Sequence, residues 1–370
     1  MTPRERFLAT VGFKKPDFPF IRVIGGWSET MERWKKEGWD GRPLGEIFGT
    51  ETILNAGVYI KDKTSSHYIY GPVPPFSRKV IKQDEHTRLV INEEGILMKE
   101  FKDYMNSSMP QFLRFPVKRR EDFQKFRKER LQLSFSQRIP SDWRQRLSLW
   151  SKGKYPVMCF ADRWGGFFGP LRNLMGLMNL CMTFHDDPVF VEEMMAERAE
   201  SIISITDEIL KYTSLDAFMF WEDMGFNKGS LIKPSMYRKM ALKYYRRVCD
   251  WLHNKGINYI FLDSDGNTWE LIPIWLEAGI NGVFPCEAKA GMDVVKIRKE
   301  YGKDLIIMGG IDKRAVAEGS KIMREEVDRV IPLVEEGGYI PELDHGAPPD
   351  ISWQNMYEYM NYLMRCLGRE

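Results

Sequence analysis

The chain is 370 residues long with a net charge of +2, and 43% of its residues are hydrophobic against 29% charged. This is the composition of an ordinary globular protein, and its near-neutral balance gives no indication of nucleic-acid binding. Five scattered cysteines without a CxxC pair argue against a disulfide framework and a structural zinc site. Without a secretory pattern or an apolar run of membrane length, we expect a cytoplasmic protein that makes no membrane contact.

The amino-terminal part of the chain is expected to begin with a strand and its loop at 18–27, followed by a short polar helix at 28–36. Residues 66–101 alternate polar and apolar side chains around a turn at 93–95, which predicts an antiparallel β-hairpin insertion. The segment 116–150 is basic, with charges at helical spacing, and we expect it to be mainly helical.

From residue 155 onward, apolar strand patterns alternate with amphipathic helix patterns. The expected strands are 157–161, 215–221, 258–262, 282–284, 304–308 and 338–341. Such alternation implies a parallel sheet with right-handed crossovers. At least seven β-α units favour a single α/β domain over 1–370, built as a closed TIM (β/α)8 barrel. An open doubly wound sheet is the alternative, although no Gly-x-Gly-x-x-Gly pattern follows a strand.

Polar residues follow the expected strands at their carboxyl ends, where a barrel gathers its functional groups. Those singled out are Asp162, Trp164, Trp221, Glu222, Asp263, Asp265, Cys286, Glu287, Asp344 and His345, with Trp27 from the first loop. Crowded acids repel one another unless a cation, a proton or donor groups compensate, and the crowding raises carboxylate pKa values. We therefore expect Glu222, Asp263, Asp265 and His345 to be catalytic within one pocket, and the others to contact substrate.

Each of these residues also has a structural interpretation. Asp263 or Asp265 would suit an Asx turn before Gly266. Cys286 fits a small buried residue better than a nucleophile, and His345 alone would fit a hydrogen-bonding role. The joint occurrence of acids and a histidine at several strand ends favours the functional interpretation.

Several motifs in the region 155–367 resemble those of the uroporphyrinogen decarboxylase superfamily. They include WEDMG at 221–225, DSDG at 263–266, GGID at 309–312, GGYI at 337–340 and DH at 344–345. The resemblance implies a TIM barrel with its site at the carboxyl ends of the strands. It also implies one of two activities, tetrapyrrole decarboxylation or corrinoid-linked methyl transfer.

The two branches of this superfamily make different demands on the sequence. In the decarboxylases that these motifs resemble, several arginines near the amino terminus bind the carboxylates of the tetrapyrrole substrate. Residues 20–27 of this chain contain only one arginine, Arg22. The corrinoid-linked methyltransferases bind zinc through a His-x-Cys pair and a final Cys, which fall by position on Asp263, Asp265 and His345. The remaining oxygen and nitrogen ligands would suit zinc or a harder divalent ion, or a proton-donating site without metal.

The sequence therefore predicts a corrinoid-linked methyltransferase or demethylase that acts on a small methylated substrate, with a corrinoid as methyl carrier. A corrinoid protein is the expected partner, and a homodimer is the expected assembly. One alternative is a decarboxylase acting on a tetrapyrrole or a smaller carboxylic acid. The other is a barrel that binds a partner without catalysis.

Overall fold

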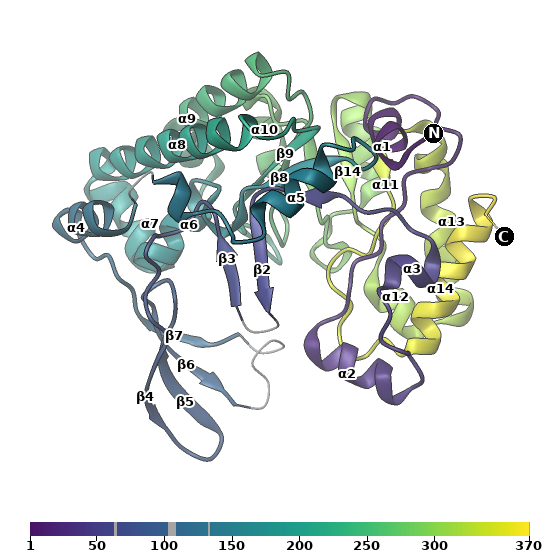
Figure 1. Ribbon diagram of the computed structural model, residues 1–370, viewed down its shortest axis with the longest axis horizontal. Coiled ribbons are helices and arrows are strands. Elements are labelled where there is room, and N and C mark those ends of the chain that lie inside the picture. The colour runs from purple at the N-terminus through teal and green to yellow at the C-terminus, as the bar shows by residue number, and fades with distance from the viewer. Residues whose placement is uncertain (63–64, 103–108, 132–133, 370) are drawn as a thin grey trace.

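Figure 1 shows the computed structural model, which describes residues 1–369 apart from 63–64, 103–108 and 132–133. Its largest sheet has seven parallel strands in the order β1-β8-β9-β12-β13-β14-β15. These strands are β1 (Leu54–Asn55), β8 (Val157–Phe160), β9 (Ala217–Trp221), β12 (Ile260–Asp263), β13 (Gly282–Phe284), β14 (Ile306–Met308) and β15 (Tyr339–Ile340). The six strands expected after residue 155 are all present, and the predicted α/β barrel architecture is confirmed.

The eighth position of the barrel is occupied by residues 20–27, between β15 and β1. The segment is extended, but it forms only a single parallel bridge, from Gly26 to Ala347. On its other side the Glu51 N–H donates to the Ile21 carbonyl at 2.8 Å. The expected first strand is therefore an irregular segment that closes the sheet into a TIM-like barrel, since adjacent glycines pair weakly in strands.

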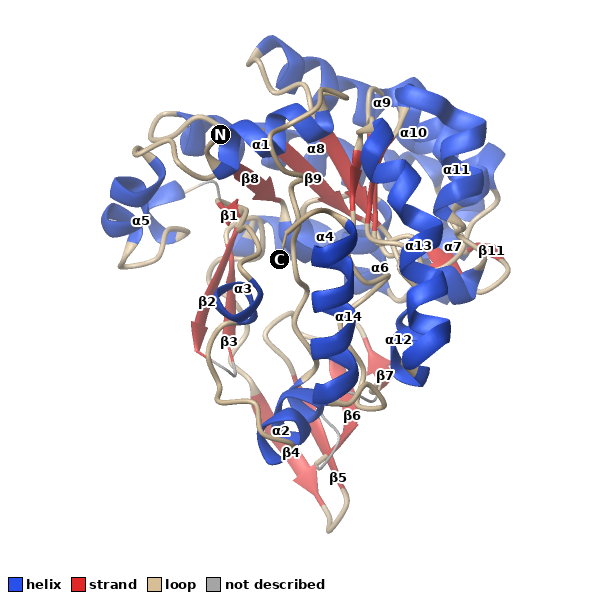
Figure 2. Cartoon of the chain, turned by 90° about the vertical axis from the view of Figure 1, so that its right-hand side faces the viewer, coloured by secondary structure: helices blue, strands red, loops and turns tan. Residues whose placement is uncertain are grey.

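Helices cover the outside of this sheet (Figure 2). On the carboxyl-terminal part of the chain they are α6 (Phe168–Met175), α7 (Leu177–Asp186), α8 (Pro188–Leu210), α9 (Pro234–Asn254), α10 (Ile272–Ala278), α11 (Val294–Tyr301), α12 (Lys313–Glu318), α13 (Ser320–Glu336) and α14 (Trp353–Cys366). Before the regular units come α1 (Pro3–Val11), α2 (Ser28–Lys36), α3 (Leu44–Phe48), α4 (Arg120–Arg130) and α5 (Trp143–Trp150). Among the described residues, no helix combines the length and apolar character needed to span a membrane.

Side chains alternate between the two faces of each strand, which divides the apolar residues into two cores. Met158, Met219 and Phe261 belong to an inner core within the barrel, whereas the intervening strand residues join a larger outer core beneath the helices. Helix α1 closes the amino-terminal end of the barrel, where Phe7 is fully buried in the inner core and the Thr10 carbonyl accepts from Gly338 at 2.7 Å. Packed side chains of α1 therefore fill this end of the barrel interior.

The predicted antiparallel insertion is present but is wider than 66–101. It contains a two-stranded sheet of β2 (Val58–Asp62) and β3 (Ser65–Tyr68), and a four-stranded sheet of β4 (Lys79–Gln83), β5 (Thr87–Ile91), β6 (Leu97–Phe101) and β7 (Gln111–Arg114). A further small hairpin joins β10 (Gly225–Phe226) to β11 (Gly229–Ser230). The four-stranded sheet projects from the side of the molecule, away from the helices of the barrel (Figure 1).

Candidate active site

A pocket of about 380 Å³ opens at the carboxyl ends of β1, β8, β9 and β12. Its apolar wall is formed by Ile53, Phe160, Met219, Phe220 and Trp221. Its polar groups are those of Arg22, Asn55, Asp162, Arg163 and Asp263. A concave, largely apolar site with a few polar groups is the usual form of a small-molecule site, and in a barrel the carboxyl end is where chemistry takes place.

Asp263 ends β12 on the same face as Phe261, so its carboxyl group points into the barrel mouth. Among the described residues none donates a hydrogen bond to this carboxyl group. Desolvation, followed by the nearby charges of Asp265 and Asp223, raises the pKa of Asp263 well above its ordinary range. The raised pKa favours the protonated form of Asp263, which can act as a proton donor.

Asp265 and His345 form a second polar group at this mouth. The Nε2 of His345 lies 3.6 Å from Oδ2 of Asp265, and the imidazole meets the Trp27 ring edge-on with ring centres 6.0 Å apart. The interaction with Asp265 raises the pKa of His345, although burial opposes it. An imidazolium beside a carboxylate is consequently favoured in the folded protein.

Removing the Asp265 charge should lower the pKa of His345. Because the folded-state pKa is raised, the ion pair stabilises the protein at low pH and is lost as pH rises through that pKa. We expect an Asp265→Asn variant to titrate His345 at lower pH than the wild type in an NMR experiment, with His345→Gln used to assign the resonance. An unchanged His345 titration in Asp265→Asn would contradict this account of the pair.

The structure brings Asp344 and Glu287 together beside this mouth, but around a lysine. Lys313 Nζ lies 3.2 Å from Oδ1 of Asp344 and 3.3 Å from Oε1 of Glu287. Asp344 is fully buried and also accepts the Ala288 N–H at 3.0 Å. Asp344 thus joins the loops after β13, β14 and β15, and its hydrogen-bonding capacity is used within the protein rather than left for a substrate.

Glu222 is not part of the mouth, contrary to the expectation from its position after a strand. Trp221 points inward, so Glu222, the next residue, points outward. Its buried carboxylate accepts the N–H groups of Phe167, Phe168 and Gly169 at 2.6–2.8 Å and the hydroxyl of Tyr245. Glu222 therefore anchors the start of α6 and acts on the pocket only through the loop that it holds.

Three of the residues expected to contact substrate are held in structural interactions instead. Trp164 is fully buried in the outer core and stacks on Phe126 with ring centres 6.1 Å apart. Burial raises the pKa of the Cys286 thiol to about 12, so it is not a thiolate nucleophile. Asp162 lines the pocket, but its carboxylate accepts the N–H groups of Tyr70 and Trp164 at 3.2 and 2.7 Å.

Three further charged residues that the sequence analysis did not single out lie at this site: Arg22 lines the pocket, and Glu342 and Asp223 lie beside its charged groups. Arg22 Nη1 lies 3.4 Å from Oε2 of Glu342, and both Glu342 oxygens are buried without a hydrogen-bond partner among the described residues. Glu342 follows β15 by two residues, and that spacing places it on the inward face with Ile340. Asp223 is paired with Arg172 at 2.6 Å, close enough to Asp263 to affect its pKa.

Asp263, Asp265 and His345 do not form the expected metal site. Within the described part of the chain, no three His, Cys, Asp or Glu side chains are arranged to hold a metal ion. His345 Nε2 and Asp265 Oδ2 face each other 3.6 Å apart, and no further His, Cys, Asp or Glu of the described chain completes a ligand set with them. The described residues therefore do not fit a metal ion.

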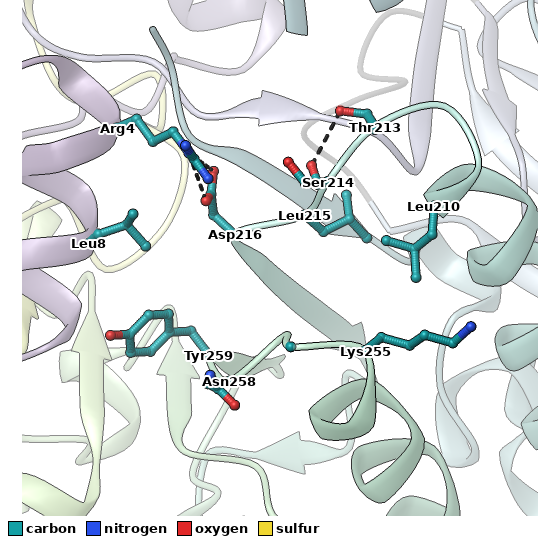
Figure 3. Close-up of a pocket in the computed structure, with 11 residues that line it drawn as sticks. Arg4, Leu8, Leu210, Thr213, Ser214, Leu215, Asp216, Lys255, Asn258 and Tyr259 are labelled. Carbon is teal, nitrogen blue, oxygen red and sulfur yellow. Dashed lines mark hydrogen bonds and ion pairs between the residues drawn. The ribbon is translucent and has the colours of Figure 1, made fainter. Parts of the chain in front are cut away.

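A larger hollow of about 630 Å³ lies at the other end of the barrel, where β9 and β12 begin (Figure 3). There Arg4 Nε is 2.9 Å from Oδ1 of Asp216, and Lys255 Nζ is 2.6 Å from Oδ1 of Asp207. These charges neutralise each other, and the amino-terminal end of a barrel contributes to stability rather than chemistry. The candidate site is therefore the smaller pocket at the mouth.

Comparison with known proteins supports this assignment of the fold. The model of the family uroporphyrinogen decarboxylase (URO-D) matches residues 112–365, which is more than half of the chain. A methyltransferase from Methanosarcina mazei has a similar fold, with a TM-score of 0.59 and 13% identity, covering 99% of this chain and 98% of that one.

Two other solved structures are less similar. A B12-independent methionine synthase from a Shewanella species gives a TM-score of 0.43 at 12% identity, covering 87% of this chain and 83% of that one. A 3-keto-D-glucoside 4-epimerase from E. coli gives 0.36 at 11% identity, covering 68% and 95%. No curated protein sequence matches significantly. On the family match, this chain belongs to the uroporphyrinogen decarboxylase family.

Proposed function

We propose that the chain transfers a methyl group from a small methyl ether or methylamine, bound in the barrel mouth, to a corrinoid acceptor. The observation that supports this proposal is the carboxyl group of Asp263, which lines the pocket and whose raised pKa favours the form that carries a proton. An oxygen or nitrogen that loses a methyl group must be protonated as it leaves, and a general acid lowers that barrier. A pocket of about 380 Å³ is at the small end of ligand sites, which favours a small substrate over a tetrapyrrole.

The groups of this chain have distinct roles in the proposed reaction. The apolar wall orients the substrate with its heteroatom at the Asp263 hydroxyl. As the bond from methyl carbon to heteroatom breaks, the Asp263 proton moves to the heteroatom and the product leaves as an alcohol or amine. The paired His345 imidazolium stabilises the negative charge that remains on Asp263.

The acceptor would approach this pocket from outside. A corrinoid ring is too large for the pocket, so we propose that a partner protein carries it to the mouth. When bound there, it supplies a reduced cobalt centre that receives the methyl group. The open carboxyl end of the barrel is the face on which that approach is possible.

A second candidate is decarboxylation of a small carboxylic acid. It is favoured by the Arg22 guanidinium, which lines the same pocket and could hold a carboxylate. In that reaction the bond to the carboxyl carbon breaks, carbon dioxide leaves, and Asp263 protonates the carbon that keeps the electron pair.

One set of assays separates these activities. Chemically reduced cobalamin is mixed with the protein and a panel of methyl ethers and methylamines, and formation of methylcobalamin is followed by absorbance. Carbon dioxide release is measured with one-ring carboxylic acids, and binding of a porphyrin is measured by absorbance titration. Methyl transfer supports the proposal. Carbon dioxide release without methyl transfer supports the second candidate, and binding without turnover contradicts both.

A further inference from the structure

Arg163 presents a guanidinium at the wall of the mouth pocket. It belongs to the short 3-10 helix η2 (Asp162–Trp164) that follows β8. It lines the pocket, and 41% of its side chain is exposed. The guanidinium carbon lies 5.5 Å from the centre of the Trp221 ring, which lines the same pocket. This cation–π contact holds the positive charge against the apolar wall.

A buried acid of the antiparallel insertion contacts the same guanidinium. Oε1 of Glu94 lies 3.6 Å from Nε of Arg163, the nitrogen nearest the stem of the side chain. Only 6% of the Glu94 side chain is exposed, and Glu94 is not among the residues that line the pocket. A guanidinium has five N–H donors, so a second carboxylate can bind the far end through the two Nη groups.

The turn that carries Glu94 has a fixed conformation. Oδ1 of Asn92 accepts the N–H groups of Glu94 and Ile96 at 3.1 and 2.8 Å. The carbonyl of Glu93 accepts the N–H of Phe76 at 2.9 Å. Both sides of the turn are therefore held by hydrogen bonds, and the Glu94 carboxylate has a defined place.

An aromatic stack joins this turn to the loop that carries Arg163. Phe76 stacks on Phe126 with ring centres 6.2 Å apart, and Phe126 stacks on Trp164 with ring centres 6.1 Å apart. Trp164 is the residue after Arg163 and is fully buried. The insertion and this wall of the pocket are thus packed as one unit, which keeps Glu94 and Arg163 in register.

The charges that face the pocket favour an anion over a cation. A second guanidinium, that of Arg22, also lines the pocket. The acidic residues among the described lining residues are Asp162 and Asp263. Burial raises the pKa of both and favours their uncharged forms, and Asp162 accepts two backbone N–H groups besides. A methylammonium in this pocket would meet like charge, whereas a carboxylate would meet opposite charge.

We propose that Arg163 binds a carboxylate of the methylated substrate and that Glu94 is the positioning residue that orients Arg163. This inference rests on the proposed function and narrows its substrate to a methyl ether that bears a carboxylate. With the carboxylate at Arg163, the ether oxygen faces Asp263 in the same pocket. The planar fork of a guanidinium matches a carboxylate in shape and in hydrogen bonding.

The test measures binding to the full-length chain by isothermal titration calorimetry, with no methyl acceptor present. The probes are three one-ring methyl ethers of similar size that differ in charge: para-methoxybenzoate, para-methoxybenzamide and para-methoxybenzylammonium. We expect the benzoate to bind the wild type about tenfold or more tightly than the uncharged amide does. The ammonium should bind more weakly than the amide.

Variants of the two residues separate charge from position. Arg163→Gln should raise the Kd of the benzoate about tenfold or more and leave the Kd of the amide unchanged. Arg163→Lys keeps the charge but loses the fork, so its benzoate Kd should be intermediate. Glu94→Asp keeps the charge but withdraws the carboxylate, and it should raise the Kd of the benzoate alone. Arg144→Gln, the same change at an exposed position of α5, should bind as the wild type does.

Four results would overturn the proposal. They are no measurable binding of the benzoate, equal affinity for the benzoate and the amide, tightest binding of the ammonium, and an unchanged benzoate Kd in Arg163→Gln. If Arg163→Gln does not fold, Arg163→Lys decides in its place, since wild-type affinity for the benzoate in that variant contradicts binding by the fork. A merely structural role of Glu94 would change the Kd values of the benzoate and the amide alike. The assay measures no turnover, so failure of this binding site and failure of methyl transfer are separate results.

Discussion

Replacing Asp263 by asparagine is expected to reduce turnover by about a hundredfold or more. Asparagine keeps the size of the side chain but cannot release a proton, and a general acid contributes at least that factor. The pocket shape is preserved, so kcat should fall far more than KM rises. The measurement is the initial rate of methylcobalamin formation at neutral pH over a range of substrate concentrations.

The stability of the same variant provides an independent check. Because the folded-state pKa of Asp263 is raised, the wild type loses stability as pH rises from the unfolded-state pKa through the folded-state value. Asparagine removes this loss. The melting temperature of Asp263→Asn should therefore be at or above that of the wild type at pH 8, on the order of 1–2 °C higher, and the difference should shrink towards pH 4.

Asp250→Asn is the matched control, since Asp250 is exposed on α9 and forms no ion pair with a described residue. It should change neither turnover nor the pH dependence of melting. Full activity in Asp263→Asn, with or without a change in melting temperature, would show that Asp263 does not take part in the reaction.

Replacing Glu222 by alanine is expected to produce a large loss of stability. The carboxylate is fully buried and accepts three backbone N–H groups, which would be left without partners. Removing one member of a buried charged network costs about 3–5 kcal/mol. We expect a fall in melting temperature on the order of 5 °C or more, measured by circular dichroism.

Two comparisons distinguish this structural role from a catalytic one. Glu335→Ala, on an exposed position of α13, should melt within about 1 °C of the wild type, because exposed changes away from special contacts have small effects. Glu222→Gln keeps the volume and should retain turnover within a few fold at temperatures where it is folded. A hundredfold loss of turnover in a fully folded Glu222→Gln protein would instead show that Glu222 takes part in the reaction.

The apolar runs of the carboxyl-terminal part were enough to predict its strands. A run of four or five apolar residues between two amphipathic helices is too short for a helix of its own, and a buried strand is the structure that fits it. The shortest strands were not predictable in that way. Residues 54–55 are a strand only because they pair with β8. A strand was expected at 18–27, but residues 20–27 close the barrel through one bridge and a few hydrogen bonds. Their structure depends on pairing with residues more than a hundred positions away, and the local sequence does not indicate which residues those are.

The sequence by itself determined the repeating β-α order, the antiparallel insertion and the gathering of polar residues at the strand ends. Only the tertiary structure decided which of those residues share a pocket. Strand β9 is buried on both faces, so no alternation of hydropathy indicated that Trp221 would face the mouth and Glu222 the outer core. The Arg22–Glu342 pair and the His345–Asp265 pair likewise arise when the barrel closes, because closure brings the first and last segments of the chain to the same rim as β12.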